Sequence, residues 1–180
     1  PHTFAIDPNS KYLVILRDLR DIICSFDSLL WKYPEVPYQF TDYPLYQQPM
    51  DKRMELYCTD TQSLLGRPLQ TLPHVMEVAH QNPNSFFILR HEDFNETPLE
   101  TFQSIYQWLG EPNFEHDFDN IPKSDYYEHD TVYRSIVSHK VGSKLKKLEP
   151  RWPKIMTERQ SRAVIQNNRW YYETFYPHFL

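Results

Sequence analysis

Two uninterrupted apolar runs stand out in the hydropathy pattern of this chain. The first, Tyr12 to Leu16, lacks the polar alternation of a half-exposed strand, which predicts a strand buried on both faces, as in a parallel sheet. The second run, Ser85 to Leu89, has the same character. Together with the helical patterns between and after them, these runs predict an α/β fold, a mainly parallel sheet flanked by helices.

Helices are predicted between the two strands at about 21–31, 51–65 and 72–81. The first of them should stop before Pro34. Residues 33–49 interleave prolines with tyrosines, and this density of proline excludes a long helix. We interpret this segment as a loop whose rings either line an acceptor pocket or pack on the body of the protein.

A strong local helix signal follows the second strand. Thr97 is placed as the N-cap, Pro98 as the first helical residue and Glu100 as the capping-box partner. Gly110 is placed at the end of the helix. Four residues form an apolar stripe along it: Leu99, Phe102, Tyr106 and Leu109.

The C-terminal part of the chain predicts one more helix, from Thr157 to about Tyr172, with Gln160 at the capping-box position. The tail that follows, WYYETFYPHFL, is too aromatic to remain in solvent. We therefore expect it to pack on the body of the protein.

Composition limits the class of protein. A chain of 180 residues with 40% hydrophobic residues is long enough for one domain with its own core. No apolar run is long enough for a membrane span, and the net charge of −5 argues against nucleic acid as a partner. Of the two cysteines, Cys24 is placed in the core, and a disulfide with Cys58 is not expected. Compartment stays open: the cytoplasm is favoured, while the sequon at Asn95 would matter in a secretory lumen.

Two arginines follow the first strand directly. Arg17 ends the apolar run, and Arg20 lies three residues later, just before the next helical pattern. In open α/β sheets ligands bind beyond the carboxyl ends of the strands, and a helix N-terminus favours anions. The pattern therefore predicts a phosphorylated ligand at this edge.

At these residues the chain resembles the sulfotransferases that use 3'-phosphoadenosine 5'-phosphosulfate (PAPS). Their motif R-x-P-R-D-x-x-x-S is matched by Arg17, Arg20, Asp21 and Ser25, with Leu19 in place of the proline. The segment from Phe87 to Pro112 resembles a later strand, the R-Y-E-D-L turn and the following helix of the same family. The resemblance implies a P-loop nucleotide-kinase-like fold.

The resemblance also implies site residues. Arg17 and Ser25 would hold the 3'-phosphate of PAPS, whereas Arg20 is expected in a structural ion pair. The family's late phosphate loop is matched loosely by Lys140 and Gly142, with Ser138 as a further candidate ligand. The alternative is that this lysine-rich stretch is a solvated basic face.

A base is needed to take the proton from the acceptor as it attacks sulfur, and histidine is suited to that role near neutral pH. In the resembled family the base often precedes the phosphate-binding strand, which makes His2 the candidate; the alternative is a histidine at a frayed terminus. His91, Glu92 and Asp93 are interpreted as a structural turn. No other His/Cys spacing indicates zinc, and cationic side chains would take the place of a metal.

Glycine is scarce, with three residues in the chain, and none of them forms a phosphate-cradling loop. The resembled family has such a loop near its N-terminus, so we expect residues 1–180 to be a single sulfotransferase-like domain without that segment. The predicted function is sulfuryl transfer from PAPS to a hydroxyl or amine of a small-molecule or glycan acceptor. The alternatives are a non-catalytic module of the same fold and another nucleotide-dependent group-transfer enzyme, such as a kinase or a glycosyltransferase.

Overall fold

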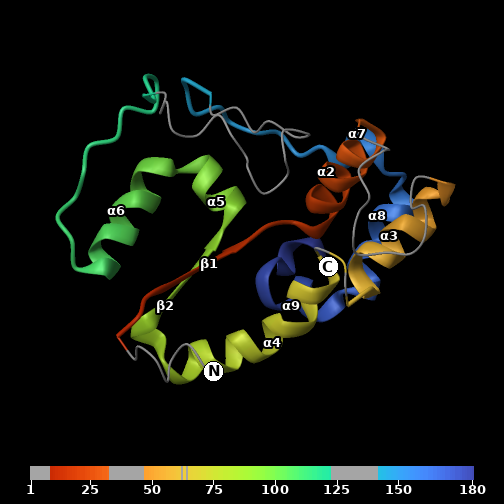
Figure 1. Cartoon of the computed structure of the whole chain (residues 1–180), viewed down its shortest axis with the longest axis horizontal. Coiled ribbons are helices and arrows are strands. Elements are labelled where there is room, and N and C mark those ends of the chain that lie inside the picture. Colours follow the sequence, from red (N-terminus) through yellow and green to blue (C-terminus); the bar gives the residue numbers. More distant parts are fainter. Residues whose placement is uncertain (1–8, 33–46, 62, 64, 123–141) are drawn as a thin grey trace. The chain divides into compact units, whose positions relative to one another are not determined.

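The two predicted strands lie side by side as a parallel pair. The computed structural model describes residues 9–32, 47–61, 63, 65–122 and 142–180. In it β1 (Tyr12–Leu16) pairs with β2 (Phe86–Arg90), from Tyr12 opposite Phe86 to Leu16 opposite Arg90 (Figure 1). The predicted strands and their parallel pairing are confirmed, with β2 one residue later than predicted.

Helices make up the other regular elements of the described residues. They are α2 (Leu19–Lys32), α3 (Met50–Thr59), α4 (Gly66–Gln81), α5 (His91–Glu96), α6 (Pro98–Leu109), α7 (Trp152–Ile155), α8 (Glu158–Asn167) and α9 (Arg169–Phe175), with short 3-10 turns at Pro83–Ser85 and Pro177–Phe179. This order of strands and helices is consistent with the predicted α/β class.

The chain divides into two compact units. The first comprises residues 1–94 and 150–180, and the second comprises residues 95–149. The first unit holds both strands and most of the helices, and the second holds α6 and the segments that follow it. The prediction of a single domain over residues 1–180 stays a prediction.

The core of the first unit joins the start of α2 to the C-terminal tail. Leu19, Ile23 and Cys24 of α2 are almost completely buried, as are Tyr172 and Tyr176 near the C-terminus. The tail therefore packs on the body, as the sequence predicts. Both cysteines are free, which confirms that they form no disulfide with each other.

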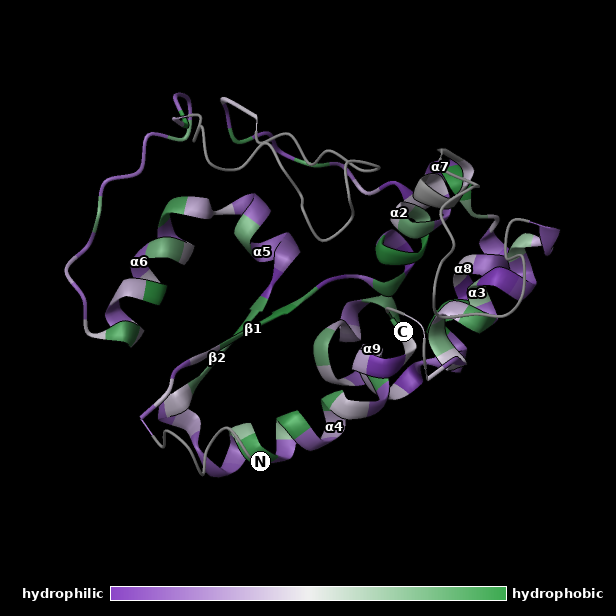
Figure 2. Ribbon diagram, viewed as in Figure 1, coloured by the Kyte–Doolittle hydropathy of each residue, from purple (hydrophilic) through white to green (hydrophobic). Residues whose placement is uncertain are grey.

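One face of the strand pair is more open than the sequence predicts. Leu13 and Ile15 of β1 point to the same face and are 44% and 61% exposed, although Figure 2 shows the strands as predominantly hydrophobic. The prediction that β1 is buried on both faces is wrong for the described residues, because none of them covers these two side chains.

The turn between α3 and α4 depends on a close approach at Gly66. A Cβ at this position would lie 2.2 Å from the carbonyl oxygen of Asp60, so only glycine fits. The Gly66 N–H donates to Ser63 Oγ at 2.7 Å and so satisfies one donor at the start of α4. As a result α4 begins six residues before the predicted position and contains Pro73.

The predicted C-terminal helix is two helices. Thr157 and Gln160 form the predicted capping box at the start of α8. The helix breaks at Asn168, whose buried side chain donates to the Val164 carbonyl at 2.9 Å. The break reorients the chain so that α9 supplies Tyr171 and Tyr172 to the core.

In the second unit, α6 begins and ends where predicted. Thr97 is the N-cap residue, and Gly110 ends the helix with φ +79, but Thr97 makes no side-chain capping bond, so the predicted capping box is absent. The centre of the apolar stripe is covered by an aromatic stack in which the Phe102 and His116 rings lie 4.1 Å apart. None of the described helices is long and apolar enough to cross a membrane.

Candidate functional site

Arg17 and His91 occupy equivalent positions at the carboxyl end of the strand pair. Leu16 and Arg90 are the last paired residues of β1 and β2, and Arg17 and His91 are the next residues along the two strands. Because parallel strands end at the same edge, these two side chains start from neighbouring points. This is the edge where open α/β sheets bind ligands.

Arg17 has hydrogen-bond donors that the described residues leave unfilled. Its Nη2 lies 3.5 Å from Asp21 Oδ2, a long ion pair. The other carboxylate oxygen of Asp21 accepts from the backbone N–H groups of Arg151 and Trp152, at 2.8 and 3.1 Å. The Arg17 Nε is buried and has no hydrogen-bond partner in the described part of the chain. A partly buried guanidinium with unfilled donors suits an anion, which it binds through a fork of charge-assisted hydrogen bonds.

Ser25 follows Arg17 and Asp21 at the helical interval. Residues four apart lie on one face of a helix, and the ion pair between Arg17 and Asp21 shows that Arg17 follows this alignment although it precedes α2. Ser25 is half-buried in α2. By this spacing Ser25 lies one turn beyond Asp21, the residue that Arg17 contacts, on the same face of α2.

The N-terminus of α2 already holds a carboxylate of the protein. Asp18 Oδ1 accepts a hydrogen bond from the backbone N–H of Arg20 at 3.0 Å, as a side-chain cap does. This cap explains why α2 begins at Leu19, two residues before the predicted start. Because Asp18 takes the position that an anionic ligand would have at this helix end, Arg17 is the stronger candidate for contact with a phosphate.

Arg20 is fixed inside the protein, as the sequence predicts. Its Nη2 and Nε donate to the Asp18 carboxylate at 2.5 and 2.9 Å, and its Nη1 donates to Ser161 Oγ at 3.2 Å. The guanidinium carbon lies 3.9 Å from the ring centre of Trp152 and 4.1 Å from that of Phe179. These partners leave Arg20 as a structural residue.

The acidic residues after β2 are structural as well. Glu92 Oε1 accepts from the backbone N–H of Asp18 at 2.9 Å, and Oε2 accepts from the Tyr176 hydroxyl at 2.7 Å. Asp93 binds the guanidinium of Arg90 through both oxygens, at 2.6 and 2.7 Å. These contacts are consistent with a structural role for Glu92 and Asp93, although the two residues form the first turn of α5 and not a separate turn.

His91 differs from its two neighbours. Burial, followed by the positive charge of Arg17, holds the pKa of His91 below its ordinary value. The structure thus places His91 within the electrostatic reach of Arg17, which the sequence interpretation missed. The available signal was its position: His91 follows β2 directly, as Arg17 follows β1.

Two tyrosines of α9 bind the residues that directly follow β1. The sequence did not predict this role for them. The Tyr171 hydroxyl donates to the backbone carbonyl of Arg17 at 2.8 Å, and the Tyr172 hydroxyl donates to Asp18 Oδ1 at 2.9 Å. Burial raises the pKa of both phenols well above the ordinary value, so they remain donors. The aromatic tail was a signal for packing, but it did not reveal these partners.

Most of the other predicted site residues are not among those that the structure describes. His2, Ser138 and Lys140 lie outside the described residues, as does most of the loop at 33–49. Gly142 is exposed and belongs to the second unit. The geometry of the candidate site therefore rests on Arg17 and Ser25, with His91 beside them.

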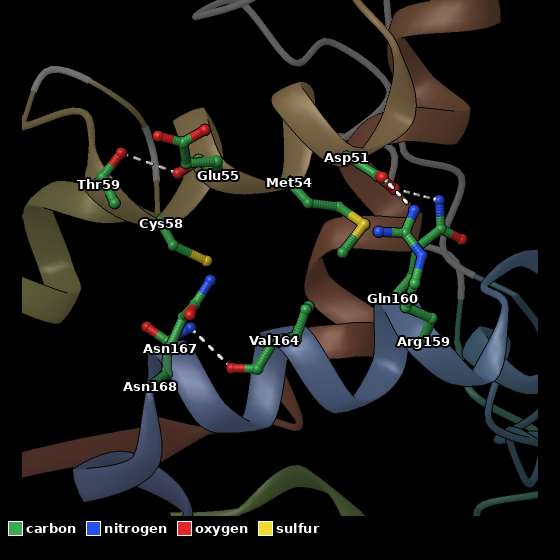
Figure 3. A pocket seen from close by; sticks show the side chains of 11 residues that line it. Asp51, Met54, Glu55, Cys58, Thr59, Arg159, Gln160, Val164, Asn167 and Asn168 are labelled. Carbon is green, nitrogen blue, oxygen red and sulfur yellow. Dashed lines mark hydrogen bonds and ion pairs between the residues drawn. The ribbon is translucent and has the colours of Figure 1, made fainter.

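A pocket of about 130 Å³ lies elsewhere in the first unit, between α3 and α8 (Figure 3). Its cationic group, Arg159, is paired with Asp51, which also accepts from Gln160 Nε2 at 2.7 Å. Burial raises the pKa of Cys58, which also lines this pocket, to about 11. The pocket has no unpaired cation for a phosphate and is not the candidate site. Among the described residues no cluster of His, Cys, Asp and Glu has the arrangement of a metal site.

Comparison with protein-family models identifies the chain. A model described as the sulfotransferase domain matches residues 2–169. The chain belongs to the sulfotransferase domain family. No curated protein and no solved structure matches it. As a member of this family the chain is a transferase whose general chemistry is sulfuryl transfer.

Proposed function

We propose that this sulfotransferase uses PAPS and transfers its sulfuryl group to a hydroxyl or amine of a small-molecule or glycan acceptor. The supporting observation is Arg17, a partly buried arginine with an unpartnered buried Nε at the carboxyl end of β1, aligned with Ser25. The fold that we propose is the P-loop nucleotide-kinase type, since the parallel strands and the ligand edge are consistent with it.

Arg17 and Ser25 would bind the 3'-phosphate of the nucleotide. The guanidinium supplies charge and a fork of donors, and the hydroxyl supplies one more hydrogen bond. Arg20 has no such role, because its donors are already used by Asp18 and Ser161. The charge of Arg17 lowers the pKa of His91, so the pKa of this imidazole would change when a phosphate binds to Arg17.

Transfer forms a bond between the acceptor oxygen or nitrogen and sulfur, while the bond from sulfur to the phosphate oxygen breaks. The leaving group is 3'-phosphoadenosine 5'-phosphate, and the acceptor proton must pass to a base. We propose His2 as that base, and Ser138, Lys140 and Gly142 as further ligands of the co-substrate, on the basis of the family resemblance. Positioning and charge stabilisation would supply most of the catalysis, as they do in phosphoryl transfer.

Calorimetric titration with 3'-phosphoadenosine 5'-phosphate tests the nucleotide site. Adenosine 5'-phosphate, which lacks the 3'-phosphate, is the ligand control. Arg17→Ala should abolish the preference for the 3'-phosphate, and Arg17→Lys should restore only part of it, because lysine keeps the charge without the fork. The matched control is Arg67→Ala, which removes an exposed arginine on α4.

Equal binding of the two nucleotides by the wild type would overturn the proposal, as would 3'-phosphate-dependent binding that Arg17→Ala leaves unchanged. If the wild type binds neither nucleotide, the result would favour the non-catalytic alternative. His2→Asn separates binding from chemistry, because it should leave nucleotide affinity intact and remove the transfer of labelled sulfate to an acceptor.

A further inference from the structure

Arg17 and His91 lie between two contacts that hold the ends of the strands together. The last pair of β1 and β2 comes directly before them. Directly after them, Glu92 Oε1 accepts a hydrogen bond from the backbone N–H of Asp18 at 2.9 Å. Because the two segments stay adjacent from one contact to the next, Arg17 and His91 are neighbours at the carboxyl edge of the strand pair. All of these residues belong to the first unit.

The half-buried imidazole of His91 is surrounded by charges from several elements. Burial opposes its protonation, and so does the positive charge of Arg17 at the end of β1. The carboxylates of Glu92, in α5 itself, and of Asp21, in α2, favour protonation. Burial and Arg17 prevail, so the pKa of His91 lies below its ordinary value of 6.5. The imidazole of the free protein is therefore neutral at neutral pH.

A phosphate bound to Arg17 would reverse this balance. Its negative charge offsets that of the guanidinium, and an anion beside an imidazole favours the protonated form. The imidazolium has an N–H on both ring nitrogens, so it can donate a charge-assisted hydrogen bond to a phosphate oxygen. By linkage, a proton on His91 strengthens phosphate binding by the same factor as the phosphate strengthens protonation.

We propose that His91 takes up a proton when the 3'-phosphate of the nucleotide binds at Arg17, so that the guanidinium and the imidazolium together bind this phosphate. This inference rests on the proposed function and adds to it a dependence on pH. The affinity for the nucleotide should increase as pH falls toward 6, because the complex then holds a proton that the free protein lacks.

The phosphate itself exchanges protons in the same range of pH. Its second pKa is about 6, and Arg17 should prefer the doubly charged form. That preference releases protons on binding, whereas His91 takes them up. Because the two effects have opposite signs, a variant without the imidazole separates them.

Calorimetric titration with 3'-phosphoadenosine 5'-phosphate, in buffers of different ionisation enthalpy, counts the exchanged protons. At about pH 6.5 the wild type should take up more protons than His91→Gln, by at most about one for each nucleotide bound. From about pH 8 to about pH 6 its affinity relative to His91→Gln should rise about threefold to tenfold, since one pKa unit corresponds to a tenfold change in affinity. His80→Gln, which replaces an exposed histidine of α4, is the matched control and should behave as the wild type does.

Proton NMR observes the same event at the imidazole. The ring C–H resonance of His91, assigned by its loss in His91→Gln, should titrate at a higher pH in the complex than in the free protein. If His91→Gln does not fold, His91→Tyr replaces it, because the R-Y-E-D-L turn that this segment resembles carries a tyrosine at this position.

The outcomes separate this inference from the function on which it rests. Failure of the wild type to bind the nucleotide through its 3'-phosphate would overturn the proposed function. If the wild type binds in this way, equal proton uptake by the wild type and His91→Gln would overturn only the role of His91. A loss of affinity in His91→Gln that is the same at both pH values would also overturn it, because a merely structural role has no dependence on the proton.

Discussion

The hydroxyl of Tyr176 donates a 2.7 Å hydrogen bond to Glu92 Oε2, which joins the C-terminal tail to the residues after β2 across 84 positions of the chain. The other oxygen of the same carboxylate accepts from the backbone N–H of Asp18. Glu92 is thus the point at which both strand ends and the tail meet. The stability of the candidate site should depend on this carboxylate and its donors.

Tyr176→Phe should therefore lower the free energy of unfolding by about 1.5–3 kcal/mol, the usual range for a hydrogen bond to a charged group. Urea unfolding measures this loss. Tyr171→Phe is the matched comparison, because its hydroxyl donates to an uncharged carbonyl and should cost only about 0.5–1.5 kcal/mol. A larger loss at Tyr171 than at Tyr176 would contradict the role assigned to Glu92.

Mutation of Arg20 should destabilise the fold much more than mutation of Arg17. Arg20→Met leaves the buried Asp18 carboxylate without its cation, and breaking a buried pair in this way costs about 3–5 kcal/mol. Arg17→Met removes only a long ion pair and an unfilled donor, and should cost less than about 1 kcal/mol. Urea unfolding of both variants compares them directly. Equal losses would show that Arg17 is structural.

His91 should make the protein less stable in acid. Above its ordinary pKa of 6.5 the imidazole is neutral in the folded and the unfolded chain, so it contributes nothing to the pH dependence. As pH falls below 6.5, the unfolded chain takes up a proton that the folded chain resists, and the free energy of unfolding decreases through the lower, folded-state pKa.

His91→Gln should accordingly gain stability relative to the wild type between about pH 7 and about pH 5, as measured by urea unfolding at both values. His80→Gln, which replaces an exposed histidine of α4, serves as the control. A wild type and a His91→Gln variant with the same pH dependence would show that Arg17 and burial do not affect this imidazole.

Neither cysteine should react readily in the folded protein. Burial raises the pKa of Cys58 to about 11 and that of Cys24 to about 12. The reactive thiolate is therefore scarce, and alkylation by iodoacetamide at about pH 8 should be at least about a hundredfold slower than in concentrated urea. Mass spectrometry counts the labelled sites. Rapid labelling of Cys58 alone would show that α3 and α8 separate in solution.

Local signals predicted much of the fold. The bounds of β1, the capping box at Thr157 and the end of α6 at Gly110 follow from residues within a few positions of each other. The predicted helix boundaries were wrong where a more distant or less regular contact determines the boundary. The side chain of Asp18 makes α2 begin two residues earlier than predicted. The close approach of Gly66 to Asp60 makes α4 begin six residues earlier than predicted.

Some residues of the candidate site could likewise be predicted from local sequence, and others could not. Arg17 and Ser25 could be proposed from one short motif, and the structural role of Arg20 followed from the same pattern. The tyrosines that bind the residues after β1 could not be predicted from the sequence. Tyr171 and Tyr172 contact residues that lie 154 positions earlier in the chain.

The different roles of Arg17 and Arg20 have an evolutionary consequence. If Arg17 binds the nucleotide, a single substitution there silences the enzyme and still leaves a folded chain available for another use. A substitution at Arg20 lowers the stability of the fold, so selection acts on it whether or not the protein is catalytic. Descendants recruited as scaffolds should therefore retain Arg20 and Trp152 while Arg17 drifts, and variation at these positions would distinguish a lineage of enzymes from a lineage of relics.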